Sequence, residues 1–172
     1  EIIENRPKKG GFKEVNALLK EAVERLDELF KNDADITGMG TGFKDLDDMT
    51  SGWQKSDLVI VAGRPSMGKT AFAMNMVEYA TLNQDRPVLV FSLEMPANQL
   101  IIRLLSSIGK IDQTRMRSGN LTEDDWPRLS SAAQRLKDRP LFIDDTSGIT
   151  PLGMRNQIKQ FTRERVEQLR QE

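Results

Sequence analysis

One short segment has the residue pattern of a phosphate-binding loop. It follows G-x-x-x-x-G-K-T, in which the glycines let backbone N–H groups turn inward around an anion. The lysine adds a positive charge for the β- and γ-phosphates, and the threonine hydroxyl can ligate Mg²⁺. The loop residues are Gly63, Arg64, Pro65, Ser66, Met67, Gly68, Lys69 and Thr70. The pattern predicts a site for the phosphates of ATP with Mg²⁺, and an ordinary glycine-rich turn is the plainer alternative.

The segments beside this loop are arranged as the chemistry requires. An apolar stretch, 58–62, precedes the loop, and residues 71–76 follow it without a helix breaker. A helix that begins at the loop directs free N–H donors and the positive end of its dipole at the bound anion. We therefore predict a strand over 58–62, the loop, and a helix over 69–82.

Glu94 is a second residue whose position suggests chemistry. It follows the continuous apolar strand that we predict over 88–92. Ligands of open α/β sheets bind at the carboxyl ends of the strands, where a carboxylate can orient a water for attack on the γ-phosphate. The chain has no histidine to take that task. A carboxylate that merely satisfies backbone donors at a helix start is an equally good interpretation of the position.

Two aspartates, Asp144 and Asp145, end the strand that we predict over 141–144. An acidic residue at the end of an apolar strand can support Mg²⁺ in a nucleoside triphosphatase. Both residues are also common turn formers, and a turn sequence follows them. From spacing alone the magnesium interpretation is slightly favoured over the structural one.

Three arginines are candidate contacts to phosphate, base or DNA: Arg103, Arg115 and Arg117. Arg103 lies on the helix after Glu94, from which it could reach back toward a nucleotide. Most surface arginines are simply solvated, and this is the plainer interpretation of all three.

Predicted strands and helices alternate along the rest of the chain. Helices are expected over 97–108 and from residue 150 onward, with a charged helical region over 112–137. Such alternation predicts an α/β fold with a mainly parallel sheet.

The N-terminal part reads as an arm. An amphipathic helix is predicted over 12–31, between a basic, glycine-containing linker and a polar connector. Its apolar stripe must be buried, either on its own domain or on a neighbouring subunit. The flexible segments on both sides favour the neighbouring subunit.

Bulk composition excludes several classes. The chain of 172 residues has no Cys and no His, so disulfides and thiolate or imidazole metal sites are excluded. Its formal net charge of −1 gives no global basic field, which leaves a local nucleic-acid contact open. No apolar run approaches the roughly 20 residues of a membrane span, and no signal peptide is visible. We expect a cytoplasmic protein with no membrane partner.

Three stretches together resemble the RecA-like ATPase domain of bacterial replicative helicases of the DnaB type: 41–70, 91–96 and 142–148. The resemblance covers nearly all of 12–164. It identifies the helix at about 12–31 as the family's linker helix, which docks on the adjacent subunit of a hexameric ring. The resulting division is a linker over 1–36, the N-terminal part of a RecA-like P-loop NTPase core over 37–164, and an unassigned 165–172.

The resemblance implies an ATP-dependent, homo-hexameric helicase that translocates on single-stranded DNA and unwinds duplex at the replication fork. ATP and Mg²⁺ would be its cofactors, and primase and a helicase loader further partners in the primosome, at the nucleoid. Lys69 and Thr70 match the family's phosphate and Mg²⁺ residues, Glu94 its catalytic glutamate, and Arg103 an arginine near the nucleotide. The family's Mg²⁺-supporting aspartate lies on a later strand, so Asp144 is expected to be structural.

The sequence departs from the family after Glu164. There the family continues into a strand with the later aspartate, whereas 165–172 is polar and helical in pattern. We therefore expect a fragment that does not unwind DNA alone. The alternatives are a nucleotide-binding or assembly and loader-docking module without turnover, or a small-molecule kinase, against which the lack of an arginine-rich lid argues.

Overall fold

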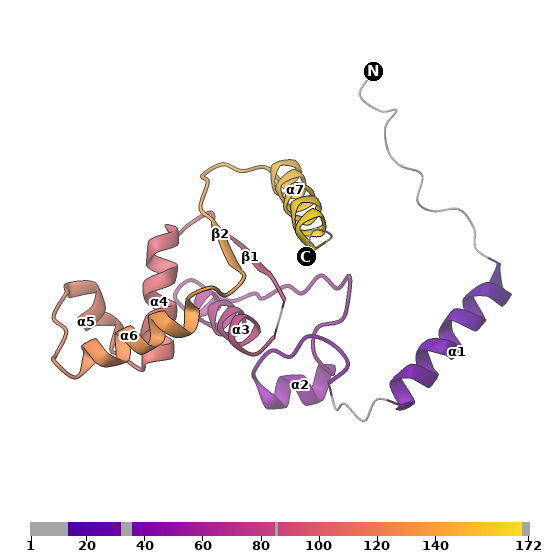
Figure 1. The fold of residues 1–172 in the computed structure, drawn as a ribbon, viewed down its shortest axis with the longest axis horizontal. Helices are drawn as coiled ribbons and strands as arrows, with labels where there is room; N and C mark the ends of the chain where they lie inside the picture. The colour runs from indigo at the N-terminus through magenta and orange to yellow at the C-terminus, as the bar shows by residue number, and fades with distance from the viewer. Residues whose placement is uncertain (1–13, 32–35, 85, 170–172) are drawn as a thin grey trace, which may run out of the picture.

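The computed structural model describes residues 14–31, 36–84 and 86–169 (Figure 1). Within these segments three helices precede the first strand, three lie between the two strands and one follows the second strand. The strands are β1 (Val88–Phe91) and β2 (Leu141–Asp144). The helices are α1 (Val15–Lys31), α2 (Lys44–Thr50), α3 (Lys69–Asn83), α4 (Ala97–Gly109), α5 (Gln113–Ser118), α6 (Asp125–Leu136) and α7 (Pro151–Leu169).

The two strands of the described residues pair in parallel. Val88 lies opposite Leu141, and Phe91 lies opposite Asp144. The connection between them runs through α4, α5 and α6, as parallel strands require a long crossover. The predicted α/β class and the strands over 88–92 and 141–144 are confirmed, the first ending one residue earlier.

The core lies between this sheet and the helices α3 and α4. Met74, Leu100 and Leu104 are at most 4% exposed and form its centre. The sheet contributes alternate side chains, Val90 from β1 and Leu141 and Ile143 from β2, because successive residues of a strand face opposite sides. Ala132 of α6, 1% exposed, extends the buried layer behind α4. This packing fixes the carboxyl end of β1 and the start of α4.

Helix α7 lies on the other side of the sheet, away from α3 and α4 (Figure 1). The rings of Phe142 in β2 and Phe161 in α7 meet edge to face, with centroids 4.6 Å apart. Phe142 nevertheless stays 45% exposed, so α7 covers this face only in part.

The strand predicted over 58–62 is not formed. This segment is irregular, and Leu58 and Ile60 are 87% and 79% exposed. A strand exists only when its backbone groups pair with a neighbour. In the part of the chain that the structure describes, β1 and β2 pair with each other and no strand pairs with 58–62. The apolar sequence of 58–62 was enough to predict a strand, but the strand does not form without a partner strand.

The predicted helices agree more closely with the structure. The helices expected over 69–82 and 97–108 are α3 and α4, each one residue longer. The charged region 112–137 contains two helices, because Gly119 adopts a left-handed conformation (φ 74°) and ends α5. Helix α7 continues through 165–169, and residues 170–172 lie outside the described part. None of the described helices is long and apolar enough to cross a membrane.

The amphipathic helix predicted over 12–31 is α1, with residues 12 and 13 outside the described part. Its apolar side chains remain in solvent: Val23 is 62% exposed, Leu26 64% and Phe30 88%. The helix approaches the rest of the chain on another side, where Glu21 and Glu24 line a pocket of about 500 Å³ with Trp53, Lys55 and other residues. The apolar stripe has no cover among the described residues of this chain.

Candidate nucleotide-binding site

The predicted phosphate loop is a tight, exposed turn that leads into α3. Ser66 and Gly68 both adopt positive φ angles, 64° and 85°. The N–H of Met67 donates to the carbonyl oxygen of Arg64 at 3.3 Å, which closes the turn. A Cβ added at Gly68 would meet no atom within 4 Å, so the space beside the loop is open. A loop of this form turns backbone N–H groups toward a common centre, as an anion site requires.

The side chain of Lys69 folds back over this loop. Its Nζ donates to the carbonyl oxygen of Gly63 at 2.9 Å and to that of Arg64 at 3.3 Å. The ammonium group therefore lies beside the loop that a phosphate would fill. Carbonyl oxygens hold the charge there without neutralising it, so it remains available to an anion.

The N-terminus of α3 is open to a ligand. Gly68 is its N-cap, and no side chain caps the free N–H groups of the first turn. Thr70 lies in that turn and is exposed. Unsatisfied donors at the positive end of a helix dipole favour a phosphate. The loop residues and this terminus together fit a polyphosphate chain.

The segment before α2 holds the start of α3 in place. The rings of Phe43 and Phe72 stack with centroids 4.9 Å apart. Asp47, 4% exposed, accepts hydrogen bonds from the N–H groups of Thr41 (2.8 Å) and Gly42 (3.3 Å). Sequence reasoning found these residues only through the family resemblance. The small, aromatic and acidic residues of this segment form no sequence pattern from which these stabilising contacts could be predicted.

Glu94 lies in the turn between β1 and α4, at the carboxyl end of the sheet. Its side chain is exposed and has no hydrogen-bond or ion-pair partner among the described residues. The Oγ of Ser92 bonds to both backbone groups of Met95, accepting from N–H at 3.2 Å and donating to the carbonyl at 2.6 Å. A tight turn thus presents the Glu94 carboxylate to solvent, where it can bind water.

Asp144 and Asp145 are both engaged in backbone contacts. Asp144 accepts a hydrogen bond from the N–H of Thr146 at 2.8 Å, and contacts with Thr146 hold the pKa of its carboxyl below the ordinary range. Asp145 accepts from the N–H of Ala97 at 2.8 Å. Among the described residues no group of three or more acidic side chains could hold a metal ion. The contacts agree with the structural interpretation of Asp144.

Arg103 lies on α4. It lines a cleft of about 500 Å³ between α4 and α5, together with Met95, Gln99, Ile102, Gln113, Met116 and Arg117. No residue of 63–70 takes part in lining that cleft. The Nε of Arg103 is buried without a hydrogen-bond partner in the described part of the chain. Its assignment as a nucleotide contact remains a prediction.

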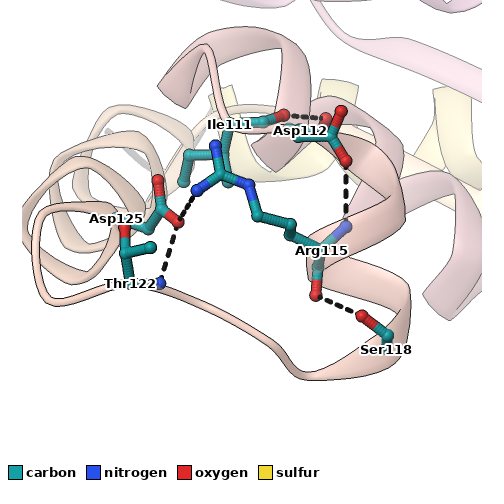
Figure 2. Close-up of polar contacts among 7 residues, drawn as sticks. Ile111, Asp112, Arg115, Ser118, Thr122 and Asp125 are labelled. Atoms are coloured by element: carbon teal, nitrogen blue, oxygen red, sulfur yellow. Dashed lines mark hydrogen bonds and ion pairs between the residues drawn. The ribbon is translucent and has the colours of Figure 1, made fainter.

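Arg115 is used within the fold (Figure 2). Its Nη1 donates to Oδ2 of Asp125 at 2.9 Å, and Asp125 also accepts from the N–H of Thr122 at 3.0 Å. The hydrogen bonds from Thr122, with Arg115 adding charge, hold the pKa of the Asp125 carboxyl low. At the other end of the residue, the N–H of Arg115 donates to Asp112. These contacts tie α5 to the start of α6.

The profile of the family described as DnaB-like helicase C terminal domain matches residues 38–170. The chain belongs to this family. Replicative DNA helicase DnaB of Haemophilus influenzae is 48% identical over 158 residues, which cover 90% of this chain and 34% of the relative. The DnaB of Buchnera aphidicola subsp. Acyrthosiphon pisum is 45% identical over 166 residues, 95% of this chain and 36% of the relative.

Two solved structures have the same fold. The ATPase domain of G40P superimposes with a TM-score of 0.80 at 30% identity, over 90% of this chain and 54% of that one. A DnaB-like replicative helicase, solved to show its interactions with primase, gives a TM-score of 0.77 at 31% identity, over 87% of this chain and 38% of that one. The predicted RecA-like core and the family resemblance are confirmed. The chain spans about a third of the length of the curated relatives it matches.

Proposed function

We propose that this chain is the nucleotide-binding part of an ATP-dependent replicative DNA helicase. The whole protein would translocate on single-stranded DNA and unwind duplex at the replication fork, in the cytoplasm at the nucleoid. The single observation that supports this best is the Lys69 ammonium folded over an open, positive-φ loop at an uncapped helix N-terminus. Membership of the DnaB-like family supplies the class of reaction.

Each residue then has a role in ATP hydrolysis. Backbone N–H groups of the loop 63–70 and the ammonium of Lys69 hold the β- and γ-phosphates. The free carboxylate of Glu94 orients the attacking water and accepts its proton. Holding charge and water in fixed positions supplies most of the rate enhancement in phosphoryl transfer. Arg103 on α4 is a further candidate contact to the nucleotide, as the family resemblance implies.

Thr70 is the residue of this chain that would hold Mg²⁺, through its hydroxyl. The ion would neutralise charge that develops on the phosphates. In the part of the chain that the structure describes, no group of three or more acidic side chains adds further ligands, so Thr70 would bind the ion together with the phosphates.

The α1 stripe supports a ring of identical subunits. Its exposed leucine, valine and phenylalanine side chains need a partner surface, and a second copy of the chain could supply one. We propose a hexamer assembled through this linker helix, with primase and a helicase loader as further partners. One solved relative, a DnaB-like replicative helicase, is described with its interactions with primase.

Lys69→Ala in the full-length protein tests the proposal. ATP hydrolysis and unwinding should fall by about a hundredfold or more, because a preorganised charge on the transferring group is lost. The ring should stay assembled in light scattering, because Lys69 lies outside α1. A matched control is Lys55→Ala, a lysine outside the loop, which should hydrolyse ATP normally. Normal hydrolysis by Lys69→Ala refutes the assignment.

The binding module without turnover is distinguished by measurements on the wild-type protein. The proposal predicts Mg²⁺-dependent ATP binding, measured by calorimetry, together with steady-state hydrolysis. Binding with no hydrolysis in the full-length protein on single-stranded DNA favours the module. Absence of any nucleotide binding favours a purely assembling role.

A further inference from the structure

The turn that carries Glu94 is held at both ends by Asp144 and Asp145. These two residues are neighbours in the chain, but they are far from the turn in sequence. At its start, the N–H of Ser92 donates to the carbonyl oxygen of Asp144 at 2.8 Å. At its end, the N–H of Ala97 donates to Oδ2 of Asp145 at 2.8 Å. The end of β2 therefore brackets the segment that presents Glu94.

The contact made by Asp145 suits the helix that it meets. Ala97 is the first residue of α4, and the first turn of α4 contains no acidic residue. Its N-cap, Pro96, has no side chain that can accept a hydrogen bond. A carboxylate at a helix N-terminus satisfies a free donor and is favoured by the helix dipole. Asp145 thus supplies from β2 the acceptor that α4 lacks.

The position of Glu94 depends on this backbone. Its carboxylate has no partner of its own among the described residues, and Ser92 and Met95 close the turn beneath it. If the start of α4 moved, the carboxylate would move with it. A displacement of about 1 Å can cost on the order of a hundredfold in rate when a group must orient a reactant.

We propose that Asp145 is a positioning residue for Glu94. It anchors the first amide of α4 and so fixes the carboxylate that orients water. Asp145 touches neither the nucleotide nor the water in this role. The inference rests on the proposed function, in which Glu94 serves ATP hydrolysis. It also gives a role to the second aspartate of the strand end, for which sequence alone suggested magnesium or a turn.

The test compares Asp145→Ala with Asp145→Asn in the full-length protein. The alanine removes the acceptor, so kcat for ATP hydrolysis should fall about tenfold or more while KM changes less than about twofold. The asparagine keeps a carbonyl acceptor, so its kcat should stay within about threefold of wild type. Asp124→Ala is the matched control, because Asp124 stands at the N-cap of α6 without a side-chain cap bond. It should behave as wild type.

Hydrogen–deuterium exchange across 92–97 reports the contact independently of activity. Asp145→Ala should exchange faster at the Ala97 amide, and Asp145→Asn should stay protected. Three results overturn the inference: a kcat for Asp145→Ala within about twofold of wild type, unchanged exchange at Ala97 in that variant, or equal kcat losses for both substitutions.

Ser92→Ala keeps the inference testable if Asp145→Ala does not fold. This substitution removes the hydroxyl that bonds to both backbone groups of Met95, and so loosens the same turn. It should lower kcat while KM is preserved, and an unchanged kcat overturns the inference. Failure of the proposed function is separate: hydrolysis by Lys69→Ala refutes the ATPase assignment itself. Loss of hydrolysis in Lys69→Ala with full activity in Asp145→Ala refutes only the positioning role.

Discussion

Two glycines with similar backbone angles serve different purposes. Gly68 has a φ of 85° with open space where a side chain would be. Gly42 also has a φ of 85°, but a Cβ there would lie 2.7 Å from ring atoms of Tyr79. At Gly68 the space beside the backbone is open, whereas the missing side chain at Gly42 allows two parts of the protein to touch.

We predict that Gly42→Ala destabilises the protein more than Gly68→Ala. Both substitutions place a Cβ on a left-handed residue, which costs about 1–2 kcal/mol. Gly42→Ala adds a clash, for which about 1–3 kcal/mol more is expected. Urea denaturation of the two variants gives the comparison. Equal losses would show that Tyr79 moves aside at little cost.

The buried Asp125 links folding to pH. Contacts with Thr122 and Arg115 lower the pKa of its carboxyl below 3.8 in the folded protein, so its contribution is complete above that value. The contribution is lost as pH falls through the folded pKa. Asp112 and Asp144 are shifted in the same direction, by backbone N–H of Arg115 and by contacts with Thr146.

We therefore predict that acid destabilises the wild-type chain more than Asp125→Asn. The variant should be less stable near neutral pH, and its stability should fall less steeply below about pH 4, because one shifted carboxyl is gone. Denaturant midpoints measured at several pH values check this. Parallel pH profiles for the two proteins would mean that Asp125 titrates as it does in the unfolded chain.

At the scale of elements, α4 does most to unite the fold. It packs against α3, α5 and α6 and contributes Leu100 and Leu104 to the core. Its sequence places apolar residues at helical spacing, which explains why it was predictable. The same helix begins at the contact with Asp145, so the core and the Glu94 turn are mechanically connected.

Leu104→Ala should lower the free energy of unfolding by about 2–5 kcal/mol, since it leaves a cavity in a packed core. Leu104 is 1% exposed, whereas Leu152 of α7 is 63% exposed. The same substitution at Leu152 should cost within about 0.5 kcal/mol. Chemical denaturation of both variants measures the difference. Similar losses at the two sites would contradict the assignment of the core.

Helix α1 gives a prediction about assembly. Leu26→Asp places a charge on the apolar stripe and should shift the full-length protein from rings to smaller species in light scattering. Lys20→Asp introduces an aspartate on the polar side of α1, where the Lys20 side chain is 80% exposed. This control should leave rings intact. The ion pair of Lys20 with Glu24 is a surface contact that contributes little. Rings that survive Leu26→Asp would exclude docking through the stripe.

At the scale of the whole molecule, sequence reasoning succeeded where structure is local. The pattern G-x-x-x-x-G-K-T, the apolar run at 88–91 and the spacing of α4 each specify their own element. The segment 58–62 failed because a strand requires a neighbour, and no property of those five residues supplies one. The bond from Asp145 to Ala97 was equally invisible, since it joins residues 48 positions apart.

Backbone hydrogen exchange in the isolated chain should distinguish the paired strands from the unpaired segment 58–62. We predict rapid exchange over 58–62 and protection at the paired amides of β1 and β2, because only the latter lie in a hydrogen-bonded ladder. Mass spectrometry of deuterated peptides resolves the two segments. Strong protection over 58–62 would mean that the segment pairs in solution after all.

The exposed run from Leu58 to Ala62 also affects how this chain behaves in the test tube. Branched apolar residues with unpaired backbone groups are a template for intermolecular sheets. Two isolated copies can satisfy each other there, and the tendency grows with concentration. We therefore expect these five residues to lower the solubility of the isolated chain, and a charged residue in place of Ile60 should delay the onset of turbidity.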